Sequence, residues 1–153
     1  MKLVFFGSPE FAIPSLSALH NSAHEIMAVV TSPDKKSGRG QSNLFLPIRE
    51  VAEKYNYPIY QPSILNDPEF LSLMKSLDAD IFVVVAYRIL PDKLISIPQE
   101  GAVNIHASLL PKYRGASPIQ HAILNGENET GVTIFRIEKK VDTGDILLQE
   151  RFK

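Results

Sequence analysis

The sequence contains no cysteine among its 153 residues. This absence excludes disulfide bonds, thiolate nucleophiles and thiolate metal ligands, and it is typical of proteins that work in a reducing compartment. Long apolar runs are lacking too: the N-terminal stretch MKLVFFGSPEF has four apolar residues in a row before glycine and proline. Such a run is too short for a signal-peptide core or a membrane span. We therefore expect a cytoplasmic protein without membrane contact, whose chain opens with a strand.

An excess of charge of one sign is also missing, because 16 basic residues stand against 17 acidic ones, for a net charge of −1. The whole molecule therefore has no electrostatic attraction to nucleic acid or to an anionic membrane. One segment differs: the loop 33–41, PDKKSGRGQ, sets Lys35, Lys36 and Arg39 against a single Asp34. A basic loop with two glycines could bind a phosphodiester backbone, although these residues taken alone favour a solvated surface loop.

Two common kinds of ligand site are not encoded. The segment FGSPEF follows the first expected strand, but it lacks the GxGxxG pattern of dinucleotide-binding turns, and Pro9 has no backbone donor. An NAD enzyme is thereby disfavoured. His20, His24 and His121 do not cluster with carboxylates at the spacing of metal ligands, so we predict no metal site.

The sequence does contain alternating strand and helix patterns. Apolar runs rich in β-branched and aromatic residues predict strands at residues 3–6, 26–30, 81–86, 102–105, 132–137 and 146–148. Helical spacing and capping residues predict helices that begin near Pro47, near Asn66-Asp67-Pro68-Glu69 and at Ser117-Pro118. This alternation predicts one α/β domain over 1–153, with a Rossmann-like, doubly wound, mostly parallel sheet and helices on both faces. Ligands bind such sheets at the carboxyl ends of the strands.

The stretch NIHASLLPKYRGASPIQ places an amide and an imidazole at such a strand end. Because side chains alternate along a strand, Asn104 and His106 share one face and Ile105 takes the other. An amide donor beside an imidazole can stabilise the oxyanion of a tetrahedral intermediate, and the imidazole can also move a proton near neutral pH. The alternative is that both side chains only tie down a loop, as histidine and asparagine often do.

A carboxylate that could orient this imidazole occurs in VDTGD, residues 141–145. Asp142 follows the apolar run 132–137 and could accept a hydrogen bond from an imidazole N–H. The simpler alternative is a turn in which Asp142 bonds only its own backbone, and Asp145 is the competing carboxylate.

Taken in order, these segments resemble the 10-formyltetrahydrofolate-dependent formyltransferases, most closely the branch that acts on methionyl-tRNA. The resemblance covers nearly the whole chain through FFGSPEFAIPSL, SPDKKSGRGQ, NIHASLLPKYRGASPIQHAILNG and TGVTIFRIEKKVDTGDIL. It implies a catalytic trio of Asn104, His106 and Asp142. It also implies that 10-formyltetrahydrofolate, the formyl-donating cosubstrate, is bound by Arg88, Ile89, Leu90, Ser108, Leu109, Leu110 and Pro111, with no metal.

The resemblance further implies direct formyl transfer to the amino group of initiator methionyl-tRNA, which loop 33–41 would contact through Lys35, Lys36 and Arg39. Compared with the family, the chain lacks the end of the catalytic domain and the C-terminal barrel that helps to bind tRNA. We expect a monomer. Three alternatives remain open: a formyltetrahydrofolate hydrolase, a formyltransferase for glycinamide ribonucleotide or an amino sugar, and a non-catalytic folate-binding module.

Overall fold

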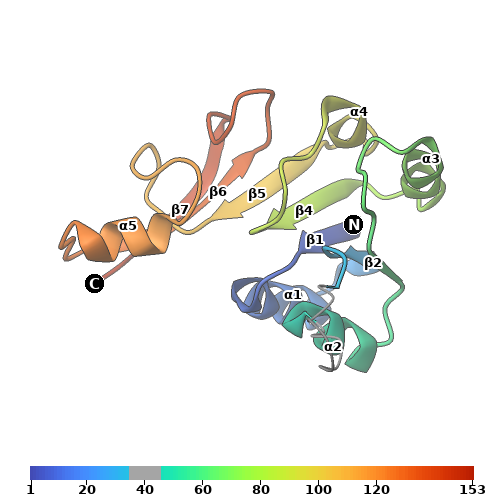
Figure 1. Ribbon diagram of the computed structural model, residues 1–153, viewed down its shortest axis with the longest axis horizontal. Helices are drawn as coiled ribbons and strands as arrows, with labels where there is room; N and C mark the ends of the chain where they lie inside the picture. Colours follow the sequence, from blue (N-terminus) through green and yellow to red (C-terminus); the bar gives the residue numbers. More distant parts are fainter. Residues whose placement is uncertain (35–45) are drawn as a thin grey trace, which may run out of the picture.

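The computed structural model describes residues 1–34 and 46–153, which form an α/β domain (Figure 1). Its strands are β1 (Lys2–Gly7), β2 (Glu25–Val30), β3 (Ile59–Tyr60), β4 (Ile81–Val85), β5 (Ala102–His106), β6 (Thr130–Arg136) and β7 (Ile146–Phe152). Its helices are the 3-10 turn η1 (Glu10–Ala12), α1 (Ile13–His20), α2 (Pro47–Lys54), α3 (Pro68–Ser76), α4 (Asp92–Ile95) and α5 (Pro118–Leu124). None of the helices in these ranges is long and apolar enough to cross a bilayer.

The strands of the described residues form one seven-stranded sheet in the order β3-β2-β1-β4-β5-β6-β7. From β3 to β5 all neighbouring strands are parallel, whereas β6 runs antiparallel to β5 and β7 antiparallel to β6. The chain order reverses between β1 and β4, which is where doubly wound sheets leave a crevice for a ligand. The structure therefore confirms the predicted mostly parallel, doubly wound sheet.

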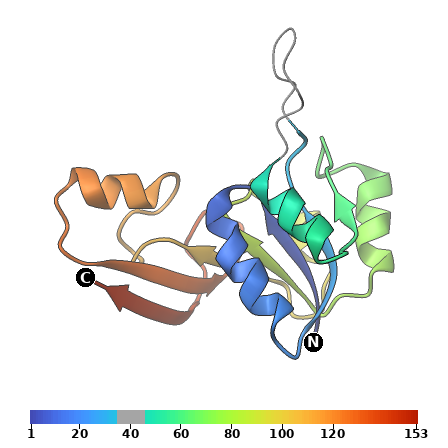
Figure 2. The ribbon, with the colours of Figure 1, turned by 90° about the horizontal axis from the view of Figure 1, so that it is seen from below.

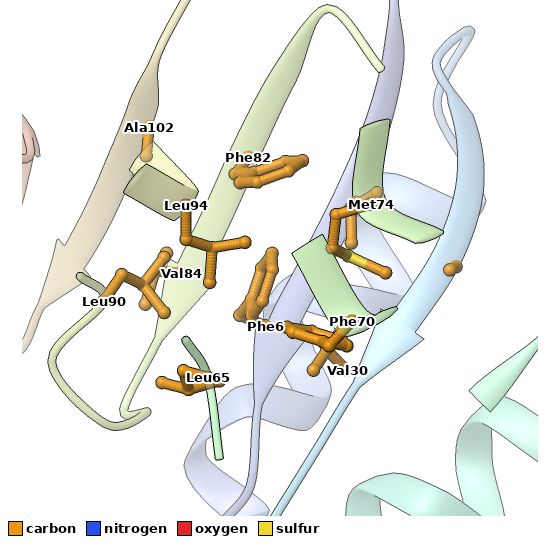
Figure 3. Close-up of a cluster of buried hydrophobic side chains, with 12 residues drawn as sticks. Phe6, Val30, Leu65, Phe70, Met74, Phe82, Val84, Leu90, Leu94 and Ala102 are labelled. Atoms are coloured by element: carbon orange, nitrogen blue, oxygen red, sulfur yellow. The ribbon is translucent and has the colours of Figure 1, made fainter. Parts of the chain in front are cut away.

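Helices pack on both faces of this sheet, as predicted. On one face α3 and α4 cover a cluster that includes Phe6, Phe82 and Met74, all fully buried (Figure 3). On the opposite face α1 and α2 cover a second cluster that includes Phe5 and Ile48. The parallel strands are therefore apolar on both sides, which is what a central strand needs when helices cover both faces.

The last elements extend the sheet beyond this two-sided core. Figure 2 shows α5 beside β6 and β7 and apart from the remaining helices. Every residue of β7 is exposed, and α5 buries Ala122 alone. Since so little of α5 is buried against the body of the fold, its position depends on the turn that precedes it and on the contacts of its two ends.

The helix boundaries lie close to the predicted capping and helix-ending residues. Helix α3 begins after Asp67, whose carboxylate accepts a hydrogen bond of 3.1 Å from the backbone N–H of Phe70. Of the two predicted capping residues, Asp67 is therefore the N-cap and Asn66 is not. Helix α5 begins at Pro118 and ends before Asn125 and Gly126, as expected, although Ser117 makes no capping bond with its side chain. The two-residue strand β3 and the single-turn helix α4 were not predicted.

Replacing the capping carboxylate should destabilise the fold at this one helix end. We expect Asp67→Ala to lower the free energy of unfolding by about 1 kcal/mol, because the amide of Phe70 loses its partner. Urea denaturation followed by circular dichroism measures this change. Asn66→Ala is the matched control, since Asn66 is exposed and does not cap the helix. Equal losses from both variants would contradict the assignment.

Candidate active site

A pocket of about 580 Å³ lies at the carboxyl ends of β4 and β5, on the side of the chain reversal. Its walls are the segment after β4 (86–90), the end of β5 (104–107), the start of α5 (115–120) and the loop after β6 (137–142), and Pro9 and Phe11 after β1 border it. Apolar side chains such as Val84 and Phe135 make up much of the lining. The pocket therefore combines an apolar interior with a few polar groups, as small-molecule sites usually do.

Asn104 and His106 lie on the same face of β5, as the alternation predicted. Val103 and Ile105 pack into the cluster under α1 and α2, so the intervening side chains point to the other face. Asn104 pairs with Val84 of β4 and Phe135 of β6 and lines the pocket. Within residues 1–34 and 46–153 its side-chain amide has no hydrogen-bond partner, so it is available to a ligand.

His106 is nearly buried, with 7% of its surface exposed, and both nitrogens of its ring face a protein group. Nε2 lies 2.8 Å from the backbone carbonyl oxygen of Tyr113, and Nδ1 lies 3.7 Å from Oδ2 of Asp142. The ring also meets Phe135 edge to face. His106 is thus held in one orientation at the wall of the pocket.

Asp142 reaches His106 by a route that the sequence did not predict. We expected it directly after the strand at 132–137, but β6 is antiparallel to β5 and ends beside Val103, at the end of β5 away from His106. The loop after β6 folds back along the sheet, and the Asp142 carboxylate accepts a 2.7 Å hydrogen bond from the backbone N–H of Gly115. Asp145 stays exposed, and its backbone oxygen accepts a hydrogen bond from the Arg136 amide. Of the two candidate carboxylates, Asp142 is the partner of His106.

The return of this loop depends on a glycine. A Cβ atom at Gly144 would overlap the carbonyl oxygen of Arg136, so any larger residue must push the loop away from β6. The Thr-Gly step of the VDTGD motif is therefore explained by a close approach of two backbone segments. The carboxylate that faces His106 lies only two positions before this contact.

The residues after β4 line the pocket at the position where the resemblance places the folate. Arg88, Ile89 and Leu90 are all in its wall. The Arg88 guanidinium donates to the backbone oxygens of Pro62 (2.6 Å) and Ser63 (3.0 Å) and to the hydroxyl of Tyr87 (2.8 Å). Burial raises the pKa of Tyr87 above its ordinary value. These contacts hold the segment in place beside the pocket, although Nε of Arg88 is buried without a hydrogen-bond partner among the described residues.

The other predicted folate residues lie elsewhere: Ser108, Leu109, Leu110 and Pro111 form the loop behind β5. The Thr133 hydroxyl of β6 donates to the carbonyl oxygen of Ser108 and accepts from the amide of Leu110. Ser108 and Leu110 are buried there, outside the pocket lining. Their predicted role in folate binding therefore stays a prediction, and Lys35, Lys36 and Arg39 lie outside the described residues.

Sequence reasoning gave no role to Tyr113 and Gly115, although both touch the trio. Tyr113 contributes its backbone oxygen to His106, and Gly115 contributes its backbone N–H to Asp142. Main-chain contacts of this kind do not depend on side-chain type, so no motif could reveal them. The sequence offered one hint of the turn itself, the glycine of the Arg-Gly step. Gly115 has a positive φ of 88°, which glycine adopts without strain.

Comparison with known proteins gives this arrangement a family. The sequence model described as formyl transferase matches residues 1–153, the full length of the chain. The chain belongs to the formyl transferase family. This confirms the resemblance, and the pocket lies within the matched region.

Similar proteins occur in many bacteria. The chain is 50% identical over 151 residues to a methionyl-tRNA formyltransferase of Caldanaerobacter subterraneus and covers 97% of itself and 49% of that protein. It is 48% identical over 151 residues to a protein of the same name from Pelotomaculum thermopropionicum, covering 98% of itself and 48% of that protein. The chain thus spans about half the length of the curated relatives that it matches.

Solved structures share the fold at lower identity. A phosphoribosylglycinamide formyltransferase from Bacillus halodurans superposes with a TM-score of 0.76 at 26% identity, over 99% of this chain and 79% of that one. A formyltetrahydrofolate deformylase from Pseudomonas syringae gives 0.78 at 25% identity, over 99% of this chain and 50% of that one. The same architecture therefore occurs in proteins named for different reactions of a formyl group.

Closing the space at Gly144 should separate Asp142 from His106. We expect Gly144→Ala to lower the free energy of unfolding by about 1–3 kcal/mol through overpacking and to shift the ring resonances of His106 in NMR spectra. Gly101→Ala is the control for destabilisation alone: its positive φ of 69° strains an alanine, but no atom lies within 4 Å of the added Cβ, and Gly101 lies outside the pocket lining. An unchanged His106 signal in Gly144→Ala would contradict the role given to this glycine.

Proposed function

We propose that this protein transfers the formyl group of 10-formyltetrahydrofolate to the free amino group of methionyl-tRNA. The observation that carries the proposal is the meeting of a free amide, an imidazole and a carboxylate in one pocket, those of Asn104, His106 and Asp142. Formyl transfer needs an oxyanion donor and a group that moves a proton, and these side chains supply both. The reaction would take place in the cytoplasm, where aminoacylated tRNA is used.

In this proposal Asn104 is the donor to the formyl oxygen. Its amide lines the pocket and is unengaged within the described residues, whereas both nitrogens of His106 already face protein oxygens. When the amine attacks the formyl carbon, the carbonyl oxygen gains negative charge. A fixed amide donor stabilises that charge most in the transition state, which is what accelerates the reaction.

His106 and Asp142 would act together on the proton. The attacking amine must lose a proton, and N10 of the folate must gain one before it leaves. A protonated His106 ring would be stabilised by the carboxylate of Asp142, 3.7 Å from Nδ1, and its positive charge would also favour the oxyanion held by Asn104. Because the pair is nearly buried, the charge interaction is screened less than it would be at the surface.

The apolar part of the pocket fits the donor. Ile89 and Leu90 belong to the segment that Arg88 fastens to residues 62 and 63, so its backbone groups are held at a fixed place in the wall. A flat, partly apolar ring with several hydrogen-bonding atoms, such as a pterin, suits such a wall. We place the folate ring there and the reacting N10 near Asn104.

The choice of acceptor rests on the sequence relatives. About 50% identity along the chain connects it to proteins named methionyl-tRNA formyltransferase, whereas the solved structures with other acceptors are about 25% identical. The basic loop 33–41 agrees with this choice, since a tRNA acceptor stem is a polyanion and glycinamide ribonucleotide is a small molecule. We propose Lys35, Lys36 and Arg39 as contacts to the tRNA backbone.

Substitutions in the trio should abolish transfer without unfolding the protein. We expect Asn104→Ala to lower kcat by a factor of roughly 100–1,000, or about 3–4 kcal/mol, because one oxyanion donor is lost. His106→Ala should reduce it at least as much. The measurement is tetrahydrofolate release from 10-formyltetrahydrofolate by the full protein, with and without methionyl-tRNA. Asn66→Ala and His24→Ala are the controls, since both residues are exposed and lie outside the pocket lining.

The same assay separates the alternatives. Release of folate without any tRNA would favour a hydrolase, and release with glycinamide ribonucleotide or an amino sugar would favour another transferase. If folate binding survives His106→Ala and no turnover occurs under any condition, the result would favour a non-catalytic folate-binding module.

The loop makes a separate prediction about tRNA. We expect Arg39→Ala to raise the KM for methionyl-tRNA severalfold and to leave the KM for the folate unchanged. The slope of log K for tRNA binding against log salt concentration should become shallower by about 1. Filter binding at several salt concentrations measures the slope. Lys75→Ala on α3 is the control, because Lys75 is exposed and lies outside the loop. An equal loss of tRNA affinity in both variants would argue against loop-specific contact.

A further inference from the structure

A short turn behind the pocket touches both titratable members of the trio. The turn, residues 113–115, points the carbonyl oxygen of Tyr113 at Nε2 of His106 (2.8 Å) and the N–H of Gly115 at the carboxylate of Asp142 (2.7 Å). We propose that Tyr113, held by Glu127, is a positioning residue that determines which nitrogen of His106 carries the hydrogen. It would act on the reaction through His106 and not on the substrate.

The chemistry of the carbonyl decides the tautomer. A carbonyl oxygen only accepts hydrogen bonds, so the 2.8 Å contact requires the hydrogen of the neutral ring to be on Nε2. Nδ1 then carries the lone pair, and it faces Asp142. A proton taken up during the reaction therefore goes to Nδ1, where the new N–H points toward a carboxylate. The opposite tautomer would leave the Tyr113 oxygen without its donor.

The turn has a backbone conformation that needs support. Tyr113 has φ of 55° and Gly115 has φ of 88°, both in the left-handed region. Glycine adopts this region without strain, but a tyrosine does so at a cost of about 1–2 kcal/mol. Something outside the turn must therefore hold Tyr113 in place if its carbonyl is to keep pointing at His106.

That support comes from the C-terminal end of α5. The Tyr113 hydroxyl donates to Oε1 of Glu127 at 2.7 Å and accepts from Nδ2 of Asn125 at 3.2 Å. The Tyr113 ring lies parallel to that of His121, with centroids 6.3 Å apart. Lys112 forms an ion pair of 3.1 Å with Glu127 from the other side. We call Lys112, Tyr113, Asn125 and Glu127 the Tyr113 network.

The hydrogen bond from Tyr113, followed by that from Lys112, lowers the pKa of the Glu127 carboxyl, so this side chain is anionic near neutral pH and accepts strongly. Glu127 itself lies outside the pocket lining. A change at this position can therefore alter the state of His106 without removing any atom from the pocket.

The decisive experiment reads the tautomer directly and needs no substrate. The full protein is labelled with ¹⁵N-histidine, and the ring nitrogens of His106 are observed by NMR at a pH at which the ring is neutral. Glu127→Ala and Tyr113→Phe each remove the contact between the hydroxyl and the carboxylate, whereas Glu127→Gln keeps an acceptor oxygen. Glu129→Ala is the control, since the Glu129 carboxylate is paired with Arg151 and makes no hydrogen bond to Tyr113 among the described residues.

We expect the wild-type protein to hold the Nε2–H form, and Glu127→Ala and Tyr113→Phe to shift the ratio of tautomers toward Nδ1–H by roughly fivefold, the effect of one net hydrogen bond. Glu127→Gln should stay closer to the wild type, and Glu129→Ala should match it. Tyr113→Phe keeps the ring and its stack on His121, so it remains informative if Glu127→Ala does not fold. An Nδ1–H form in the wild type, or unchanged tautomers in Tyr113→Phe, would overturn the inference.

The kinetic consequence rests on the proposed function. We expect kcat for formyl transfer to fall roughly tenfold to a hundredfold in Glu127→Ala, with the KM for the folate unchanged, because the reacting groups are misplaced while the pocket is intact. A shifted tautomer in a protein without formyl transfer would refute the function and leave the positioning role standing. A shifted tautomer with unchanged kcat would overturn the role of Tyr113 in the reaction.

Discussion

The change from parallel to antiparallel pairing between β5 and β6 is the constraint on which the site depends. In an all-parallel sheet the loop after the next strand would begin beside His106. Here it begins at the far edge, near Val103, and must return along the sheet before Asp142 can face the imidazole. The close backbone approach at Gly144 and the hydrogen bond from Gly115 are the two features that make this return possible. The site is therefore assembled by main-chain geometry as much as by its side chains.

That geometry also pairs several polar groups around the pocket with other parts of the protein. His106 has protein oxygens at both nitrogens, Arg88 is occupied by carbonyl oxygens and a hydroxyl, and Asp142 accepts from a backbone amide. Groups satisfied in this way are held in place before a ligand arrives, which would reduce the reorganisation needed in the proposed reaction. The Asn104 side-chain amide lines the pocket and has no hydrogen-bond partner among residues 1–34 and 46–153, so it can donate to a ligand.

The sequence predicted the elements whose signals are long or chemically distinct. The strand at residues 81–85 is an uninterrupted apolar run, and Asn66-Asp67-Pro68-Glu69 is a recognisable helix start, so both elements were placed correctly, although the cap is Asp67 and not Asn66. The strand β3 has only Ile59 and Tyr60, too few residues for any period to show. The partnership of Asp142 with His106 was expected, but the direction of β6 was not, because strand direction depends on tertiary pairing. Tyr113 was missed because its contact uses a carbonyl that every residue has.

The alternation along β5 joins the folding of the sheet to the chemistry of the pocket. Val103 and Ile105 pack under α1 and α2, and Asn104 and His106 face the opposite side. A slip of β5 by one residue against β4 would reverse this arrangement, placing an amide and an imidazole in the apolar layer and two aliphatic side chains in the pocket wall. The cost of burying those polar groups disfavours the slipped register. Hydrophobic packing during folding thus selects the register that turns Asn104 and His106 toward the pocket, before any ligand is present.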